Sequence, residues 1–134
     1  MIKEMQYENY RKIEALAQDF YKGYEYLVVS YGTHPCAYVI IPEGHPLTKV
    51  ADYDDVDVNC HGGCTYLDWG LGDFISQEHK VIGWDYLHLG DFNGCSSLFS
   101  KKWTKKWTTE EIIGECEHVI EQLYVLEHPE LYYE

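Results

Sequence analysis

The sequence predicts an α+β domain: a small antiparallel sheet flanked by an N-terminal and a C-terminal helix. Apolar residues recur at helical spacing near both ends of the chain, and the stretches between them are short and rich in β-branched and aromatic residues. With 134 residues, of which 46% are hydrophobic, the chain is long enough to bury one core. We therefore expect residues 1–134 to form a single domain.

The expected N-terminal helix covers residues 3–22. Four apolar residues in it follow the i, i+3, i+4, i+7 spacing of one helix face: Ile13, Leu16, Ala17 and Phe20. Gly23 would end this helix. The C-terminal helix has the clearer start signal, because Thr108 and Glu111 fit a capping box. It should run to about residue 126, before Pro129.

Four strands are expected between the helices, at residues 26–31, 36–41, 65–69 and 80–85. The first two should form a hairpin at the centre of the sheet. Both helices would pack on one face of the sheet, and the other face would carry many of the thirteen tyrosines. Half-exposed aromatic residues suit a partner surface, although in strands they are more often ordinary cross-strand packing.

The net charge of −13 bears on the choice of partner. Residues 31–100 hold ten acidic and two basic side chains, and such a surface repels nucleic acid phosphates. A basic protein partner fits better, and it would contact an exposed acidic loop comprising Asp52, Asp54, Asp55 and Asp57. The acidity is equally explained as a means of keeping a small protein soluble.

Five cysteines, an odd number, favour a reducing compartment with all thiols free. No apolar run approaches the length of about 20 residues that spans a bilayer. We expect a soluble, cytoplasmic monomer that binds neither membrane nor nucleic acid directly.

The stretch from Cys60 to Asp91 concentrates imidazoles, carboxylates and glycines. Its candidate metal ligands are His61, Asp85, His88 and Asp91. They supply the mixed nitrogen and oxygen set that suits zinc. The alternative is that the histidines are hydrogen-bonded around a tight glycine turn while the aspartates cap backbone amides. A nucleophilic Cys64 paired with His88 is a weaker alternative.

The sequence resembles a family of small uncharacterised phage and prophage proteins in two motifs. They are H-G-G-x-T-Y, beginning at His61, and G-W-D-x-x-H-x-G-D, which ends at Asp91. In that family the residues flanking H-G-G are usually aliphatic, so Cys60 and Cys64 depart from the pattern. This departure favours the histidine and aspartate set over a cysteine site.

The resemblance implies a phage protein acting in the cytoplasm of an infected bacterium. By analogy with small acidic phage proteins, we expect an anti-CRISPR inhibitor that binds a Cas nuclease such as Cas9, with zinc in a structural role. The alternative function is a metal-dependent hydrolase, or a sponge, acting on a nucleotide-like small molecule. The sequence contains no recognisable arrangement of nucleophile, general base and oxyanion donor.

Overall fold

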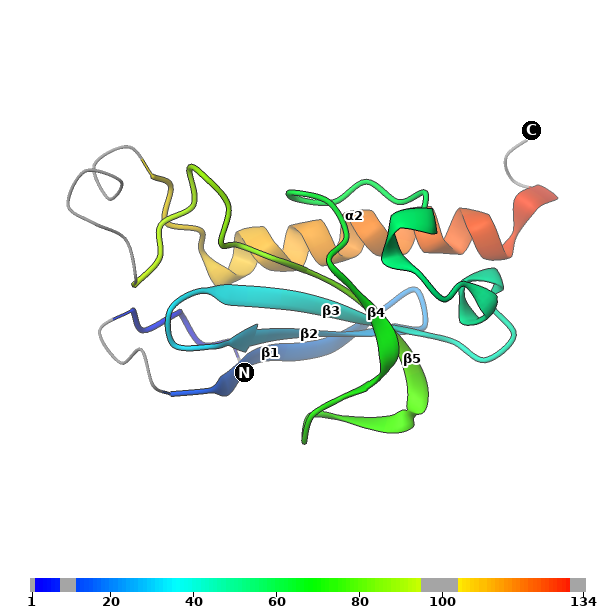
Figure 1. Cartoon of the computed structure of the whole chain (residues 1–134), viewed down its shortest axis with the longest axis horizontal. Helices are drawn as coiled ribbons and strands as arrows, with labels where there is room; N and C mark the ends of the chain where they lie inside the picture. The colour runs from blue at the N-terminus through cyan, green and yellow to red at the C-terminus, as the bar shows by residue number, and fades with distance from the viewer. Residues whose placement is uncertain (1, 8–11, 95–103, 131–134) are drawn as a thin grey trace.

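A computed structural model describes residues 2–7, 12–94 and 104–130. Within them, five antiparallel strands form one sheet in the order β1-β2-β3-β5-β4, and one helix, α2, lies across one face (Figure 1). The elements are β1 Glu14–Tyr21, β2 Tyr24–Ser30, β3 Pro35–Ile41, β4 Tyr66–Leu71, β5 Ile75–Asp85 and α2 Thr109–Glu127. The predicted α+β class, the antiparallel sheet and the C-terminal helix are confirmed.

The predicted N-terminal helix is wrong for the described residues, since residues 14–21 form strand β1. A β-bulge at Leu16 breaks the strand's alternation, so that consecutive residues Leu16 and Ala17 are both buried. This adjacent pair, with exposed Ile13 and Phe20 on either side, imitates the spacing of a helix face. Residues 8–11 of the expected helix lie outside the described residues.

The turn between β1 and β2 explains the role of Gly23. Lys22 and Gly23 have φ angles of 50° and 83°, and Tyr21 pairs with Tyr24 across them. Two consecutive residues with positive φ are the geometry of a two-residue hairpin turn, so Gly23 turns a hairpin rather than ending a helix.

Helix α2 packs its apolar face against the sheet and forms the main core. Thr108 accepts a hydrogen bond from the Glu111 amide, and the Glu111 side chain accepts one from the Thr108 amide, which confirms the capping box. The buried face of the helix consists of Thr109, Ile112, Cys116, Val119, Ile120 and Leu123. Ile82 and Trp84 of β5, both almost fully buried, belong to the same core cluster as this helix face.

The other face of the sheet has a smaller core. There the β4–β5 hairpin turns away from the helix (Figure 1), and Leu71 and Ile75 near its tip pack in one cluster with Leu27 and Val29 of β2. Tyr38 belongs to this cluster, and Tyr31 and Tyr66 pack against it. Part of the predicted tyrosine face is therefore ordinary packing.

The long connection between β3 and β4 contains two short 3-10 helices, Pro46–Lys49 and Tyr53–Asp55. Buried His45 attaches this connection to α2, because its Nε2 donates to the Leu123 carbonyl while its Nδ1 accepts from the Leu47 amide. His45 is therefore a structural residue. Across the described residues, no helix combines the length and apolarity needed to cross a bilayer.

Candidate metal centre

The two motifs found in the sequence meet at one end of the sheet. The His61-Gly62-Gly63 turn precedes β4, and the segment from Tyr86 to Asp91 follows β5. After this segment the chain forms a parallel bridge between Asp91 and Lys105, which brings Trp107 to the same place. Three stretches that are distant in sequence therefore surround one cluster of polar side chains.

Asp91 is the centre of this cluster. Its side chain is almost fully buried and accepts hydrogen bonds from the His61 ring, from the His88 amide at 3.0 Å and from the Trp107 indole at 2.9 Å. Burial acts to raise the pKa of the Asp91 carboxyl, but these hydrogen bonds outweigh it and hold the pKa below its usual value. Asp91 is consequently an ionised carboxylate at neutral pH.

Aromatic rings hold His61 in place. Its ring stacks on Tyr86 with centroids 4.5 Å apart and planes 9° from parallel, and the Trp107 ring meets it edge-on at 4.9 Å. His61 Nε2 lies 2.9 Å from both carboxylate oxygens of Asp91. The ring is thus fixed in position before any ligand binds.

His88 has one buried polar atom without a hydrogen bond among the described residues. Its Nδ1 is buried and makes no hydrogen bond within the described part of the chain, although it lies 3.4 Å from Asp91 Oδ2 and 3.6 Å from Asp85 Oδ1. The ring lies directly over Gly62, where an added Cβ would overlap its atoms. Gly62 is therefore required both for its φ of 69° and for the close approach of the imidazole.

His61, His88 and Asp91 form a cluster that can hold a metal ion, because one ligand atom from each lies within 4.8 Å of the others. The predicted fourth ligand, Asp85, stands at the margin of this group. Its Oδ1 accepts from the Leu87 amide and its Oδ2 from the Thr65 hydroxyl, both at 3.1 Å. Asp85 and Asp91 therefore both cap backbone amides, which is the alternative role expected for the aspartates.

The acidic loop lies apart from this cluster, in the β3–β4 connection. Its four aspartates, Asp52, Asp54, Asp55 and Asp57, are all exposed. Asp52 caps the second 3-10 helix by accepting a hydrogen bond from the Asp54 amide at 2.9 Å, and the other three aspartates are exposed to solvent. The loop thus presents negative charge at the surface.

The described cysteines are free thiols: Cys36, Cys60, Cys64 and Cys116. Cys95 lies outside the described residues. Burial raises the pKa of Cys60 to about 12 and also raises that of Cys64, so both thiols stay protonated at neutral pH. Neither has the lowered pKa of a catalytic nucleophile.

We expect Cys36 and Cys116 to resist alkylation in the folded protein. Both are buried, and burial raises the pKa of Cys36 to about 12 and that of Cys116 further still, so almost no thiolate exists at pH 7.5. Iodoacetamide labelling followed by mass spectrometry should show these two sites modified only after urea is added. Rapid modification of either one without urea would contradict the described packing.

Sequence reasoning missed two residues of this site. Trp107 donates to Asp91 from sixteen residues away, and Tyr86 supplies the ring on which His61 stacks. Tyr86 lies inside the second motif and could have been suspected there. Nothing in the lysine-rich segment around Trp107 indicates the role of this tryptophan. Trp107 reaches the site only because Lys105 forms a parallel bridge with Asp91.

Comparison with protein-family models, with curated protein sequences and with solved structures finds no match to this chain.

Proposed function

We propose that this protein is an acidic binding protein whose fold is stabilised by one zinc ion at His61, His88 and Asp91. The observation that carries the zinc site is the buried Nδ1 of His88, which makes no hydrogen bond within the described residues and lies beside an ionised carboxylate and a second imidazole. A buried nitrogen without a hydrogen bond costs free energy, and a metal ion would offset that cost.

The donor set fits zinc. Two imidazoles and one carboxylate are ligands that zinc accepts readily in proteins, whereas calcium and magnesium prefer oxygen ligands alone. The hydrogen bonds to Asp91 from Trp107 and from the His88 amide would orient the carboxylate and remain available when an ion is bound. Bound zinc would join the His61 turn to the segment after β5.

The proposed binding partner is a basic protein. The exposed aspartates from Asp52 to Asp57 and the net charge of −13 support it, since complementary charge accelerates association and excludes acidic surfaces. The specific form of this proposal is a phage inhibitor of a Cas nuclease, acting in the bacterial cytoplasm. Its support is the charge balance together with the resemblance of the two motifs.

The second candidate function is a metal-dependent hydrolase, or a sponge, for a nucleotide-like molecule. One observation favours it: the side chains of His61 and His88 are 21% and 32% exposed, so an ion on three protein ligands has an open side. Zinc with an open position acts as a Lewis acid. A hydrolase would lose turnover in a folded His88→Ala variant and would not need the acidic loop.

We expect neutralisation of the acidic loop to weaken capture of Cas9. Changing Asp52, Asp54, Asp55 and Asp57 to Asn removes four exposed charges, and at low salt this should weaken binding by about tenfold and flatten its salt dependence. Immobilised wild-type and variant proteins would be compared for retention of Cas9, with and without guide RNA, at two salt concentrations.

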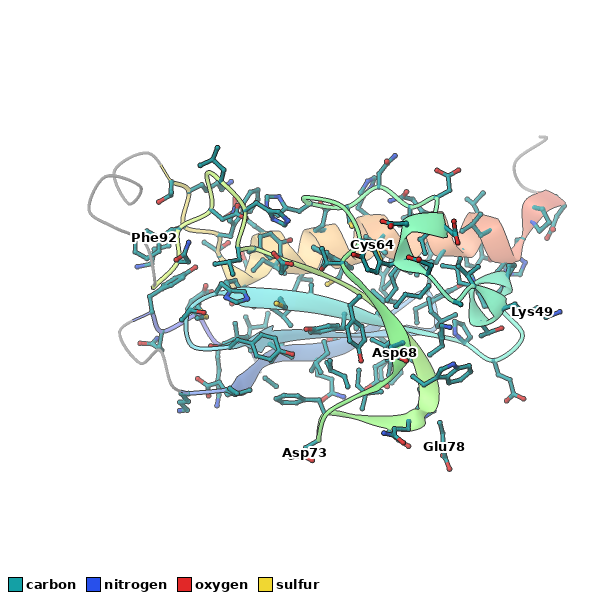
Figure 2. The ribbon with its side chains drawn as sticks, viewed as in Figure 1. Lys49, Cys64, Asp68, Asp73, Glu78 and Phe92 are labelled. Carbon is teal, nitrogen blue, oxygen red and sulfur yellow. The ribbon has the colours of Figure 1, made fainter. Side chains whose placement is uncertain are left out.

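A matched control removes four exposed carboxylates elsewhere, at Glu43, Asp68, Asp73 and Glu78. Three of these are labelled in Figure 2, in the region of the β4–β5 hairpin. The control should retain Cas9 binding. Equal loss in both variants would mean that total charge, not the loop, matters. If the wild-type protein captures Cas9 neither with nor without guide RNA, the Cas nuclease proposal is wrong.

A further inference from the structure

A cleft of about 440 Å³ opens on the face of the sheet that α2 does not cover. It lies between the β2–β3 turn and the adjoining ends of β3, β4 and β5. Its lining includes Tyr31, His34, Tyr38, Thr65, Tyr66 and Asp85. Asp85 links the cleft to the metal centre, because its Oδ1 lies 3.6 Å from His88 Nδ1.

Aromatic rings form the floor and walls of the cleft. The Tyr38 ring lies against Gly83 of β5, where an added Cβ would overlap it. Tyr66 meets this ring edge-on at 5.6 Å, and the hydroxyl groups of Tyr31 and Tyr38 are hydrogen-bonded at 2.9 Å. Tyr31 and Tyr66 are only half-buried, so part of each ring faces the opening.

At the rim of the cleft, the Asp85 carboxylate has free hydrogen-bond acceptor positions. Asp85 accepts one hydrogen bond on each oxygen, from Leu87 and from Thr65, whereas an ionised carboxylate has about four acceptor positions. Its side chain remains 27% exposed. Two acceptor directions are therefore open to a ligand that brings donors.

No cation of the described chain occupies this position. Among the described residues, Asp85 has no lysine or arginine within ion-pairing distance, and its only such contact is the His88 ring. Burial lowers the pKa of His34, although Asp85 acts in the opposite direction, so this imidazole is neutral at pH 7 and does not repel a cation.

We propose that this cleft binds the guanidinium group of an arginine presented by the basic protein partner. Asp85 accepts two parallel N–H donors from the guanidinium, while the planar group stacks against the rings of Tyr31 and Tyr66. Arginine fits better than lysine because its planar fork matches a carboxylate and stacks on aromatic faces. The negative charge of the chain favours a cation here, whereas a phosphate would be repelled.

This inference rests on the proposed basic partner, but a small probe tests it without that partner. N-acetyl-arginine amide would be titrated into the full-length protein while the tyrosine ring signals are followed by NMR. We expect a Kd of about millimolar, with shifts at Tyr31 and Tyr66. N-acetyl-lysine amide should bind about tenfold more weakly.

Asp85→Asn should weaken arginine binding by about tenfold, because the amide can still accept from Leu87 but carries no charge. The matched control is Asp73→Asn, which removes an exposed carboxylate at the tip of the β4–β5 hairpin, outside the cleft, and should leave Kd unchanged. Equal weakening in both variants, or shifts confined to other residues, would overturn the proposal.

The titration is repeated with and without one equivalent of zinc. If the protein binds arginine but takes up no zinc, the arginine-binding proposal is supported and the metal site is wrong. If the protein takes up zinc but does not bind arginine, the metal site is supported and the arginine-binding proposal is wrong. If zinc abolishes arginine binding, Asp85 is engaged by the ion and the proposed cleft is wrong.

Discussion

The proposed zinc site predicts that removal of the ion lowers the melting temperature of the protein by about 10 °C. A ligand that binds only the folded state at a concentration a hundredfold above its Kd stabilises that state by about 2.7 kcal/mol. For a domain of this size, each kcal/mol corresponds to roughly 3 to 5 °C. Differential scanning calorimetry of zinc-loaded and chelator-treated protein measures the change.

The control for this prediction is the pair of variants His61→Ala and His88→Ala. Each removes one imidazole ligand, so its melting temperature should be the same with zinc and with chelator. A variant at an exposed histidine outside the cluster, His79→Ala, should respond to zinc as the wild type does. Retention of the full zinc response by both ligand variants would place the site elsewhere.

Gly62→Ala is expected to destabilise the fold by about 3 kcal/mol, from roughly 1 kcal/mol of left-handed backbone strain and about 2 kcal/mol of steric overlap. The overlap arises because the new Cβ would occupy the position of the His88 ring. Displacing that ring should also reduce zinc affinity by at least about tenfold. Urea unfolding and competition with a fluorescent chelator measure the two effects.

The neighbouring glycine provides a matched control. Gly63 also has a positive φ, of 87°, but an added Cβ there meets no atom within 4 Å. Gly63→Ala should therefore cost only the backbone strain, about 1 kcal/mol, and leave zinc affinity unchanged. Equal effects at the two positions would show that His88 does not need the space over Gly62.

The sequence predicted the fold wherever its signals were local. The capping box at Thr108 located the start of α2, and the β-branched runs located β2 and β3. The predicted N-terminal helix was wrong at β1, where a bulge buries two consecutive residues and imitates helical periodicity. The Lys22-Gly23 pair between two tyrosines is the hairpin signal in this stretch, but a glycine at this place also fits the end of a helix.

The ligand types and the two motifs were enough to predict the main residues of the candidate site. His61, His88 and Asp91 are together in the structure, and Gly62 explains why glycine follows His61. Spacing alone could not separate Asp85 from the cluster, because its orientation depends on hydrogen bonds to Leu87 and Thr65. Trp107 is brought to the site by tertiary pairing, which no local pattern encodes.

The most direct test of the account is X-ray absorption spectroscopy of the protein loaded with one equivalent of zinc. The account predicts stoichiometric zinc with only nitrogen and oxygen neighbours at about 2.0 to 2.2 Å, including two imidazoles, and no sulfur neighbour at about 2.3 Å. A sulfur neighbour would assign the ion to a cysteine outside the proposed ligand set, and a protein that retains no zinc after dialysis would contradict the site altogether.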